Sequence, residues 1–212
     1  MIIALISQKG GVSKTTLARA LAVEAVRGGL TVDAVDFDSG QATLAEWAKD
    51  RIKAGHAPVV GVRIAKTIEE ALRGSAADVA IIDGPAKADA LTLELAKAAD
   101  IVVQPTNAGL DDLRPAVRTF NGLVDRGIPR ARLLVALSRV GSDAEALAAR
   151  EYLEVAGYAV AAGHLPERLT YRNLHNGGYA VTEARLEGLR TAAENLIQSI
   201  IDAAAVAAEA RE

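Results

Sequence analysis

The chain has 212 residues, a length typical of one domain, and half of them are hydrophobic although only 3% are aromatic. It contains no cysteine, which excludes disulfides, thiolate metal sites and iron–sulfur clusters. The formal net charge of −3 gives no overall attraction to nucleic acid, so a DNA-binding surface would have to be local. We therefore expect one domain over residues 1–212, with a core of alanine, valine, leucine and isoleucine.

The start of the chain carries no charged-then-apolar leader, and no apolar run approaches the roughly 18 residues of a membrane span. These two features predict a cytoplasmic protein.

Short β-rich runs alternate with helical patterns along the chain. Strands are expected over residues 2–7, 31–36, 59–64, 78–83, 101–104, 132–138 and 158–161. Helices are expected at about 14–28, 41–54, 67–73, 88–98, 111–125, 142–156 and 182–207. Continuous apolar strands separated by amphipathic helices predict an α/β fold, a doubly wound and mostly parallel sheet with helices on both faces.

The segment QKGGVSKTT, residues 8–16, lies between the first expected strand and the first expected helix. A glycine-bearing loop in this place, ending in Lys-Thr, is typical of a P-loop, whose backbone N–H groups point at phosphate oxygens. Lys14 would contact the β- and γ-phosphates of a nucleotide, and the Thr15 hydroxyl would ligate Mg²⁺. The match to the general Walker A pattern is incomplete, because Gln8 and Ser13 stand where it has glycines.

Aspartates follow two of the expected strands, at the edge of the sheet where ligands bind in doubly wound folds. One strand ends in Asp36-Phe37-Asp38, and another ends in Asp83-Gly84-Pro85. Asp83 is expected to hold Mg²⁺ directly or through water, and Gly84 to let the backbone approach the γ-phosphate. One aspartate of this kind often only caps a helix. Two of them beside a P-loop favour a magnesium–nucleotide site.

The order Lys-Gly-Gly-x-x-Lys-Thr-Thr, with Lys9 near its start, resembles the deviant Walker A motif of the ParA/MinD family of ATPases. The resemblance implies that Lys9 reaches across a dimer interface to the nucleotide of the other subunit. It implies nucleotide contacts from Lys9, Gly10, Gly11, Val12, Ser13, Lys14, Thr15 and Thr16. Ser13 replaces the family's usual glycine, and serine tolerates a positive φ poorly, so loop geometry and turnover are the properties most affected.

The resemblance extends to the aspartates. Asp36-Phe37-Asp38 matches the family's Asp-x-Asp, which implies that Asp38 positions the hydrolytic water and that Asp36 supports the magnesium. The implied catalytic residues are Lys9, Lys14 and Asp38, and the implied metal ligands are Thr15, Asp36 and Asp83. Trp47 also fits the family pattern, although its helical spacing from Leu44 predicts a core residue.

Two later segments also resemble the family. Leu137-Ser138-Arg139 fits the strand end near the adenine, and residues 166–171, followed by Gly178, Val181 and Glu183, fit the stretch that closes over the base. The resemblance therefore implies nucleotide contacts from Arg139, Pro166 and Arg168.

The short chain is most similar to plasmid-type ParA proteins. This implies a weak Mg²⁺-dependent ATPase that forms an ATP-dependent homodimer in plasmid or chromosome partition. A centromere-binding partner of ParB type would stimulate hydrolysis, and the ATP dimer would bind DNA without sequence preference, on the nucleoid. Candidate DNA contacts are Arg139, Arg172, Arg185 and Arg190.

Two alternatives stay open. A MinD-like membrane-cycling ATPase would need a basic amphipathic C-terminal helix, which this alanine-rich tail does not resemble, so no membrane partner is expected. A dethiobiotin-synthetase-like enzyme would phosphorylate a small substrate and would not need Lys9. The histidines His56, His164 and His175 share no metal-ligand spacing and are expected on the surface. Asp111 and Asp112 are candidates to cap the helix that follows them.

Overall fold

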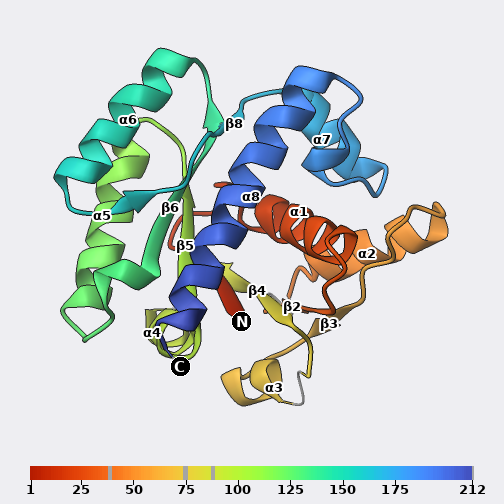
Figure 1. The fold of residues 1–212 in the computed structure, drawn as a ribbon, viewed down its shortest axis with the longest axis horizontal. Coiled ribbons are helices and arrows are strands. Elements are labelled where there is room, and N and C mark those ends of the chain that lie inside the picture. The colour runs from red at the N-terminus through yellow and green to blue at the C-terminus, as the bar shows by residue number, and fades with distance from the viewer. Residues whose placement is uncertain (38–39, 74–75, 87–88, 212) are drawn as a thin grey trace.

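A computed structural model describes residues 1–37, 40–73, 76–86 and 89–211 of the chain. Its centre is an eight-stranded sheet in the order β3-β2-β4-β1-β5-β6-β7, with β8 beside β6, and every pairing among the described strands is parallel (Figure 1). The strands are β1 (Ile2–Ser7), β2 (Val32–Asp36), β3 (Val62–Ile64), β4 (Val79–Ala86), β5 (Ile101–Thr106), β6 (Leu133–Val140), β7 (Ala159–Val160) and β8 (Leu165–Pro166). The predicted fold class is confirmed.

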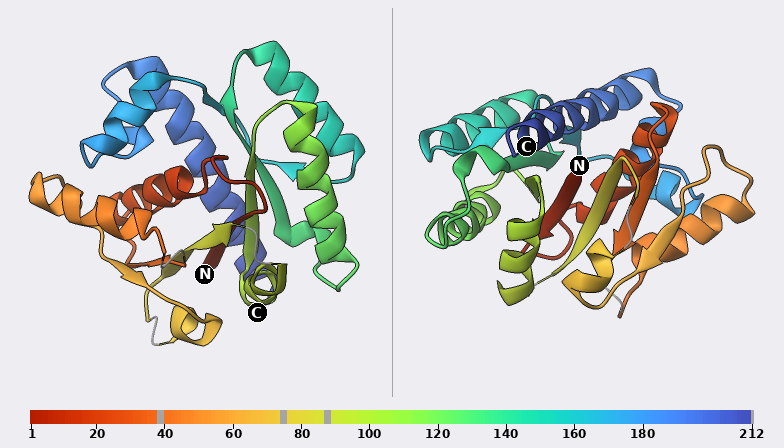
Figure 2. Two further views of the ribbon diagram at one scale, coloured as in Figure 1. Left: turned by 180° about the vertical axis from the view of Figure 1, so that it is seen from behind. Right: turned by 60° about the horizontal axis from the view of Figure 1, so that its bottom comes forward.

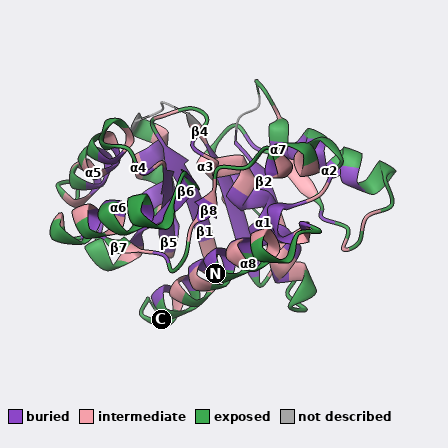
Figure 3. Cartoon of the chain, turned by 90° about the horizontal axis from the view of Figure 1, so that it is seen from above, coloured by how far each residue is buried: buried purple, intermediate pink, exposed green. Residues whose placement is uncertain are grey.

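Helices cover both faces of this sheet (Figure 2). The helices are α1 (Lys14–Arg27), α2 (Thr43–Lys53), α3 (Ile68–Leu72), α4 (Asp89–Ala98), α5 (Leu110–Val124), α6 (Asp143–Val155), α7 (Leu169–Asn176) and α8 (Glu187–Glu209). One core cluster joins the sheet to α1, α2, α7 and α8, and a second joins it to α3, α4, α5 and α6. The buried strands lie between helices whose outer faces are exposed (Figure 3).

Period-2 and period-3.6 patterns predicted most of these elements to within a few residues, and two short ones were not expected. β8 has two residues, and α7 is a polar eight-residue helix in which Tyr171 is the one buried side chain. β8 is too short to display a period, and α7, with one buried side chain, shows no apolar stripe. The last helix also begins later than expected, because a 3-10 turn at Val181–Glu183 precedes α8.

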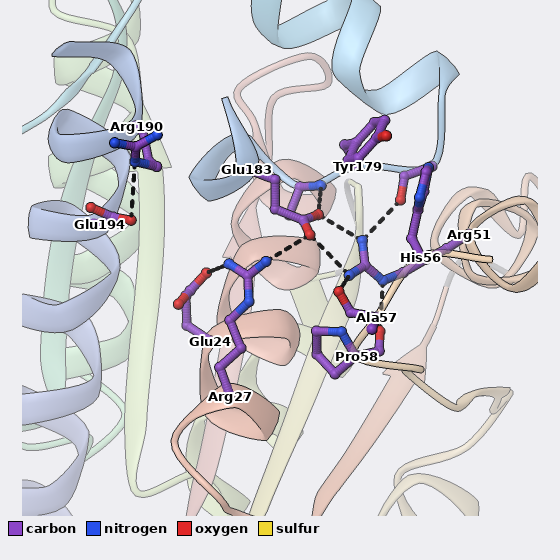
Figure 4. Close-up of polar contacts among 12 residues, drawn as sticks. Glu24, Arg27, Arg51, His56, Ala57, Pro58, Tyr179, Glu183, Arg190 and Glu194 are labelled. Carbon is purple, nitrogen blue, oxygen red and sulfur yellow. Dashed lines mark hydrogen bonds and ion pairs between the residues drawn. The ribbon is translucent and has the colours of Figure 1, made fainter. Parts of the chain in front are cut away.

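A buried arginine on α2 fastens the segment between α7 and α8 to the rest of the domain (Figure 4). The Arg51 side chain is fully buried and forms a two-pronged ion pair with Glu183, with Nη1–Oε2 at 2.6 Å and Nη2–Oε1 at 3.0 Å. It also donates to the carbonyl oxygens of Ala57, Pro58 and Gly178. Because it is both charged and buried, Arg51 depends on all of these acceptors.

Gly178 allows this approach. Its φ is +78°, and a Cβ placed on it would lie 2.9 Å from both N and Cα of Arg51. Trp47, one turn earlier on α2, is 2% exposed and donates from Nε1 to the Tyr179 carbonyl. The expectation that Trp47 is a core residue is confirmed, and the two contacts hold the end of α7 close to α2.

The C-terminal end of α8 is packed against the sheet and against α4. Ala204 and Ala207 are buried, and Arg211 donates to the Ala98 and Ala99 carbonyls and pairs with Asp100. In the described parts of the chain, no helix combines the length and apolarity that crossing a bilayer requires.

Candidate functional site

The P-loop connects β1, which ends at Ser7, to α1, which begins at Lys14. Ser13 occupies the N-cap position of α1 with a φ of 79°, and its side chain makes no capping hydrogen bond. A left-handed backbone costs a non-glycine residue roughly 1–2 kcal/mol. The expected strain at Ser13 is therefore present in the structure. The first turn of α1 carries no acidic residue, so its N–H groups can receive an anion.

The P-loop lines a cavity of about 550 Å³, within the range of small-molecule sites. Of the predicted nucleotide contacts, the cavity brings together Gly11, Val12, Ser13, Lys14, Thr15, Thr16, Arg139, Pro166 and Arg168, and its lining does not include Lys9 or Gly10. Counting the described residues, the lining contains four arginines and a lysine but only one carboxylate, which suits an anionic ligand.

Two residues at the end of β6 form hydrogen bonds with the P-loop. Ser138 donates from Oγ to the Val12 carbonyl at 3.1 Å, and Arg139 donates from Nη1 to the Gly11 carbonyl at 3.2 Å. Arg139 also pairs with Glu167, next to β8, at 2.6 Å. These contacts place Pro166 and Arg168 in the same cavity lining as the phosphate-binding loop.

Thr15 and Asp83 form the part of the site that fits a divalent cation. The Thr15 hydroxyl donates to Asp83 Oδ2 at 2.6 Å, while Asp83 Oδ1 is buried and has no hydrogen-bond partner among the residues described. Burial raises the pKa of Asp83 to about 6, although the Thr15 hydroxyl and the Lys14 charge oppose the shift. A hard cation would satisfy both the unpaired oxygen and the buried charge. These residues therefore fit Mg²⁺.

Asp36 lies beside Asp83 in the register of β2 and β4. Its Oδ2 accepts from the Leu44 and Ala45 amides at 2.8 and 3.1 Å, so this oxygen holds the first turn of α2 in place. Asp38, the predicted catalytic aspartate, lies outside the described residues. Among those described, no three or more His, Cys, Asp or Glu side chains could hold a metal together. Mg²⁺ usually keeps several waters and binds through one or two carboxylates together with substrate phosphates.

The structure shows a packing reason for glycine at position 84. A Cβ at this position would lie 2.5 Å from the Leu5 carbonyl oxygen of β1. Gly84 thus permits close pairing of β4 with β1, which is a packing requirement that the sequence alone does not show.

Lys9 points to α5. Its Nζ pairs with Asp112 Oδ1 at 2.6 Å and donates to the Asp111 carbonyl at 2.7 Å, and its side chain is 43% exposed. Asp112 also accepts from Asn107, whereas the N-cap of α5 is Gly109 with no side-chain capping bond. The expectation that these aspartates cap α5 is wrong, because Gly109 is the N-cap and both aspartates lie inside the first turn of the helix.

The candidate DNA contacts lie on different elements of the fold. Arg139 and Arg172 line the cavity, Arg185 is exposed just before α8, and Arg190 on α8 lies 3.8 Å from Glu194. Figure 4 shows the Arg190–Glu194 pair on α8.

Four cavity residues were missed in the sequence, Arg19, Thr43, Leu165 and His175. Arg19 could have been found, since it lies four residues after Thr15 and so on the same face of α1. The expectation that His175 is a surface residue is wrong. It is half-buried on α7, and burial together with the Arg19 charge lowers its pKa to about 3. The location of α7 over the cavity depends on tertiary packing.

The fold and the site define a P-loop nucleotide-binding protein whose loop carries an additional lysine. The chain belongs to the CobQ/CobB/MinD/ParA nucleotide-binding domain family, whose model matches residues 3–181. The resemblance to ParA and MinD is thereby confirmed. Among curated proteins, no match is found.

Several solved structures share the fold. MinD from Pyrococcus horikoshii, complexed with Mg-ADP, is 21% identical with a TM-score of 0.73, over 97% of this chain and 98% of that one. A putative plasmid partition protein from Borrelia burgdorferi, bound to AMPPNP, is 16% identical with a TM-score of 0.70, over 95% and 98%. The McdA(D38A)–ATP complex from Cyanothece is 18% identical with a TM-score of 0.67, over 94% and 96%.

Proposed function

We propose that this protein is a Mg²⁺-dependent ATPase that dimerises when ATP is bound and acts in plasmid or chromosome partition. The observation that carries the proposal is the separation of the two P-loop lysines. Lys14 lines the cavity, whereas Lys9 lies outside it and is partly exposed. A lysine that does not face the nucleotide of its own chain is available to the nucleotide of a second chain.

The nucleotide would bind with its phosphates on the P-loop and the first turn of α1. Lys14 would contact the β- and γ-phosphates, and Thr15 and Asp83 would hold Mg²⁺, which supplies charge neutralisation to the phosphates when bound. Arg139 and Pro166 would border the base. The Mg-ADP, ATP and AMPPNP named for the structural relatives support the choice of an adenine nucleotide with magnesium.

Dimerisation and nucleotide binding would be thermodynamically linked, because Lys9 contributes to phosphate binding only when a second chain is present. In the single chain Asp112 neutralises Lys9. When the dimer forms, Lys9 must therefore leave the Asp112 carboxylate and pair with a phosphate of the other chain. Dimerisation would then depend on the presence of the γ-phosphate.

Replacing Lys9 with alanine should leave nucleotide affinity in the monomer unchanged but weaken ATP-dependent dimerisation about tenfold or more, since a charge-assisted hydrogen bond contributes about 1.5–3 kcal/mol. Calorimetry measures the first quantity, and light scattering with ATP measures the second. Lys97→Ala is the matched control, because Lys97 is an exposed lysine on α4. Normal ATP-dependent dimerisation by the Lys9 variant would favour the metabolic alternative.

Replacing Asp38 with alanine should preserve ATP binding and dimerisation and lower turnover about 100-fold or more, the usual contribution of a group that positions or activates the attacking water. Turnover is measured by phosphate release, and gel filtration with ATP shows the accumulated dimer. Unchanged turnover would mean that another carboxylate positions the attacking water, and Asp36 would be the next candidate.

DNA binding should require ATP, weaken steeply with added salt and show little dependence on sequence, because phosphate contacts release counterions and dimerisation doubles the basic surface. Titration of labelled duplexes with ADP or ATP at several salt concentrations measures all three properties. Arg185→Ala and Arg190→Ala should each reduce the salt slope, as expected when a phosphate contact is removed. Equal affinity with ADP and ATP, or none at low salt, would contradict a role in partition.

The proposal includes a ParB-type partner that stimulates hydrolysis and a cytoplasmic protein that collects on the nucleoid in its ATP form. The packed end of α8 supports this assignment over a membrane-cycling ATPase, because Ala204 and Ala207 are already buried and Arg211 is anchored beside α4. Vesicle pelleting with ATP distinguishes the two.

A further inference from the structure

A buried arginine lies in the wall of the nucleotide cavity, away from the loop that binds phosphate. Arg19 is 7% exposed and lines the same cavity as Lys14 and Thr15. Its position is set by a hydrogen bond from Nη2 to the Thr43 carbonyl at 3.2 Å and by the Trp47 ring, whose centroid is 5.6 Å from Cζ. The guanidinium is therefore held in a definite place.

Arg19 lacks the partners that such a buried charge needs. Its Nε has no hydrogen-bond partner, and within the described residues it forms no ion pair. Asp83 and Asp36 attract it at longer range, but the cost of burial exceeds their effect and lowers the pKa of Arg19 to about 10. Arg51, which is at least as buried, is instead paired with Glu183. A buried cation without a counter-ion destabilises the folded state unless an anion binds.

A second side chain with an unsatisfied polar atom lines the same cavity, from helix α7. His175 on α7 has a buried Nε2 with no hydrogen-bond partner among the described residues, and Arg19 lies close enough to lower its pKa. The neutral imidazole can donate from Nε2 in one of its tautomers. Two helices thus each contribute to the cavity lining a side chain that carries an unused polar atom.

We propose that Arg19 and His175 form an anion-binding subsite beside the P-loop, which takes phosphate oxygens of the bound nucleotide. The inference rests on the proposed function, since it places a nucleotide in this cavity. A cation bound at Asp83 would neutralise a carboxylate that now attracts Arg19, which leaves the guanidinium to the phosphates. Arg19 also contacts Thr43, the first residue of α2, so occupancy of the subsite would act directly on the start of that helix.

The test is the Arg19→Met variant, which keeps the length of the side chain and removes its charge. Calorimetry should show affinities for ATP and ADP reduced about 10- to 100-fold, as for loss of a charge-assisted hydrogen bond, and Arg19→Lys should restore part of them. Adenosine should bind parent and variant equally, and His175→Ala should lose less affinity for ATP than Arg19→Met. Without nucleotide, the Tm of Arg19→Met should equal or exceed that of the parent, because an unpaired buried charge is gone.

The matched control is Arg51→Met, which removes a buried but fully paired arginine and should lower the Tm of the nucleotide-free protein. Equal ATP affinity in parent and Arg19→Met would overturn the subsite alone. A fall in the nucleotide-free Tm of Arg19→Met as large as that of Arg51→Met would also overturn it, since Arg19 would then be a structural residue. Failure of the parent itself to bind ATP would overturn the nucleotide proposal together with the subsite.

Discussion

Replacing Lys14 with alanine is expected to abolish nucleotide binding, with affinity for ATP reduced about 100-fold or more. The reason is that, of the residues that the structure describes, Lys14 is the one lysine in the lining of the cavity, and it stands at the first position of α1, where phosphate would meet the helix N-terminus. A charge-assisted hydrogen bond to phosphate contributes about 1.5–3 kcal/mol, and Lys14 would make more than one. Isothermal titration calorimetry with ATP and ADP measures the loss.

The Lys9→Ala variant serves as the internal control for this result, because it removes the same side chain from the same loop at a position outside the cavity. The Lys9→Ala monomer should bind ATP as the parent does, whereas Lys14→Ala should not. Far-UV circular dichroism should show both variants folded. If the Lys14 variant bound ATP as tightly as the parent, the P-loop assignment would be wrong.

Replacing Arg51 with methionine is expected to destabilise the domain by about 3–5 kcal/mol, the cost of breaking a buried ion pair by removing one partner. Methionine is similar in length but leaves the Ala57, Pro58 and Gly178 carbonyls without their donor. Glu183 would keep the pairing with Arg27 at 2.8 Å. Urea denaturation of parent and variant, with the midpoint and slope fitted together, measures the difference in the free energy of unfolding.

Arg73→Ala provides the comparison for an exposed pair. Arg73 pairs with Glu69 on the surface of α3, with side chains 68% and 81% exposed, and pairs of this type contribute about 0–1 kcal/mol. A change for Arg51→Met no larger than that for Arg73→Ala would contradict a structural role for the Arg51–Glu183 pair. A destabilised Arg51 variant should also bind nucleotide more weakly, because the segment it anchors carries α7.

The order of the longer strands and helices could be read from the sequence because each of them is long enough to show its own period. The apolar run of β1 and the spacing of Leu17 and Leu21 in α1 are local properties. The elements at residues 165–176 could not be predicted in this way. β8 has two residues and α7 has few apolar side chains, so their structure depends on what they pack against.

The site residues also fall into two groups, those recognised from a local motif and those whose contacts only the structure shows. The P-loop and Asp83 were found because a phosphate-binding loop and a strand-end carboxylate each have a contiguous pattern. The distinction between the two lysines could be anticipated only from resemblance, and the pairing of Lys9 with Asp112 joins residues about a hundred positions apart. Asp36 was expected at the metal, and the structure adds that its Oδ2 anchors α2.

The sequence by itself determined the parallel α/β architecture and the phosphate-binding loop, since periodicity and short motifs act through neighbours along the chain. Only the tertiary structure decided which side chains share the cavity. Arg19 and His175 come from helices separated by most of the chain, and the Arg51–Glu183 pair and the close approach at Gly178 hold α7 where they meet. Such contacts depend on long-range packing and on the partners of buried charges, which leave no local pattern in the sequence.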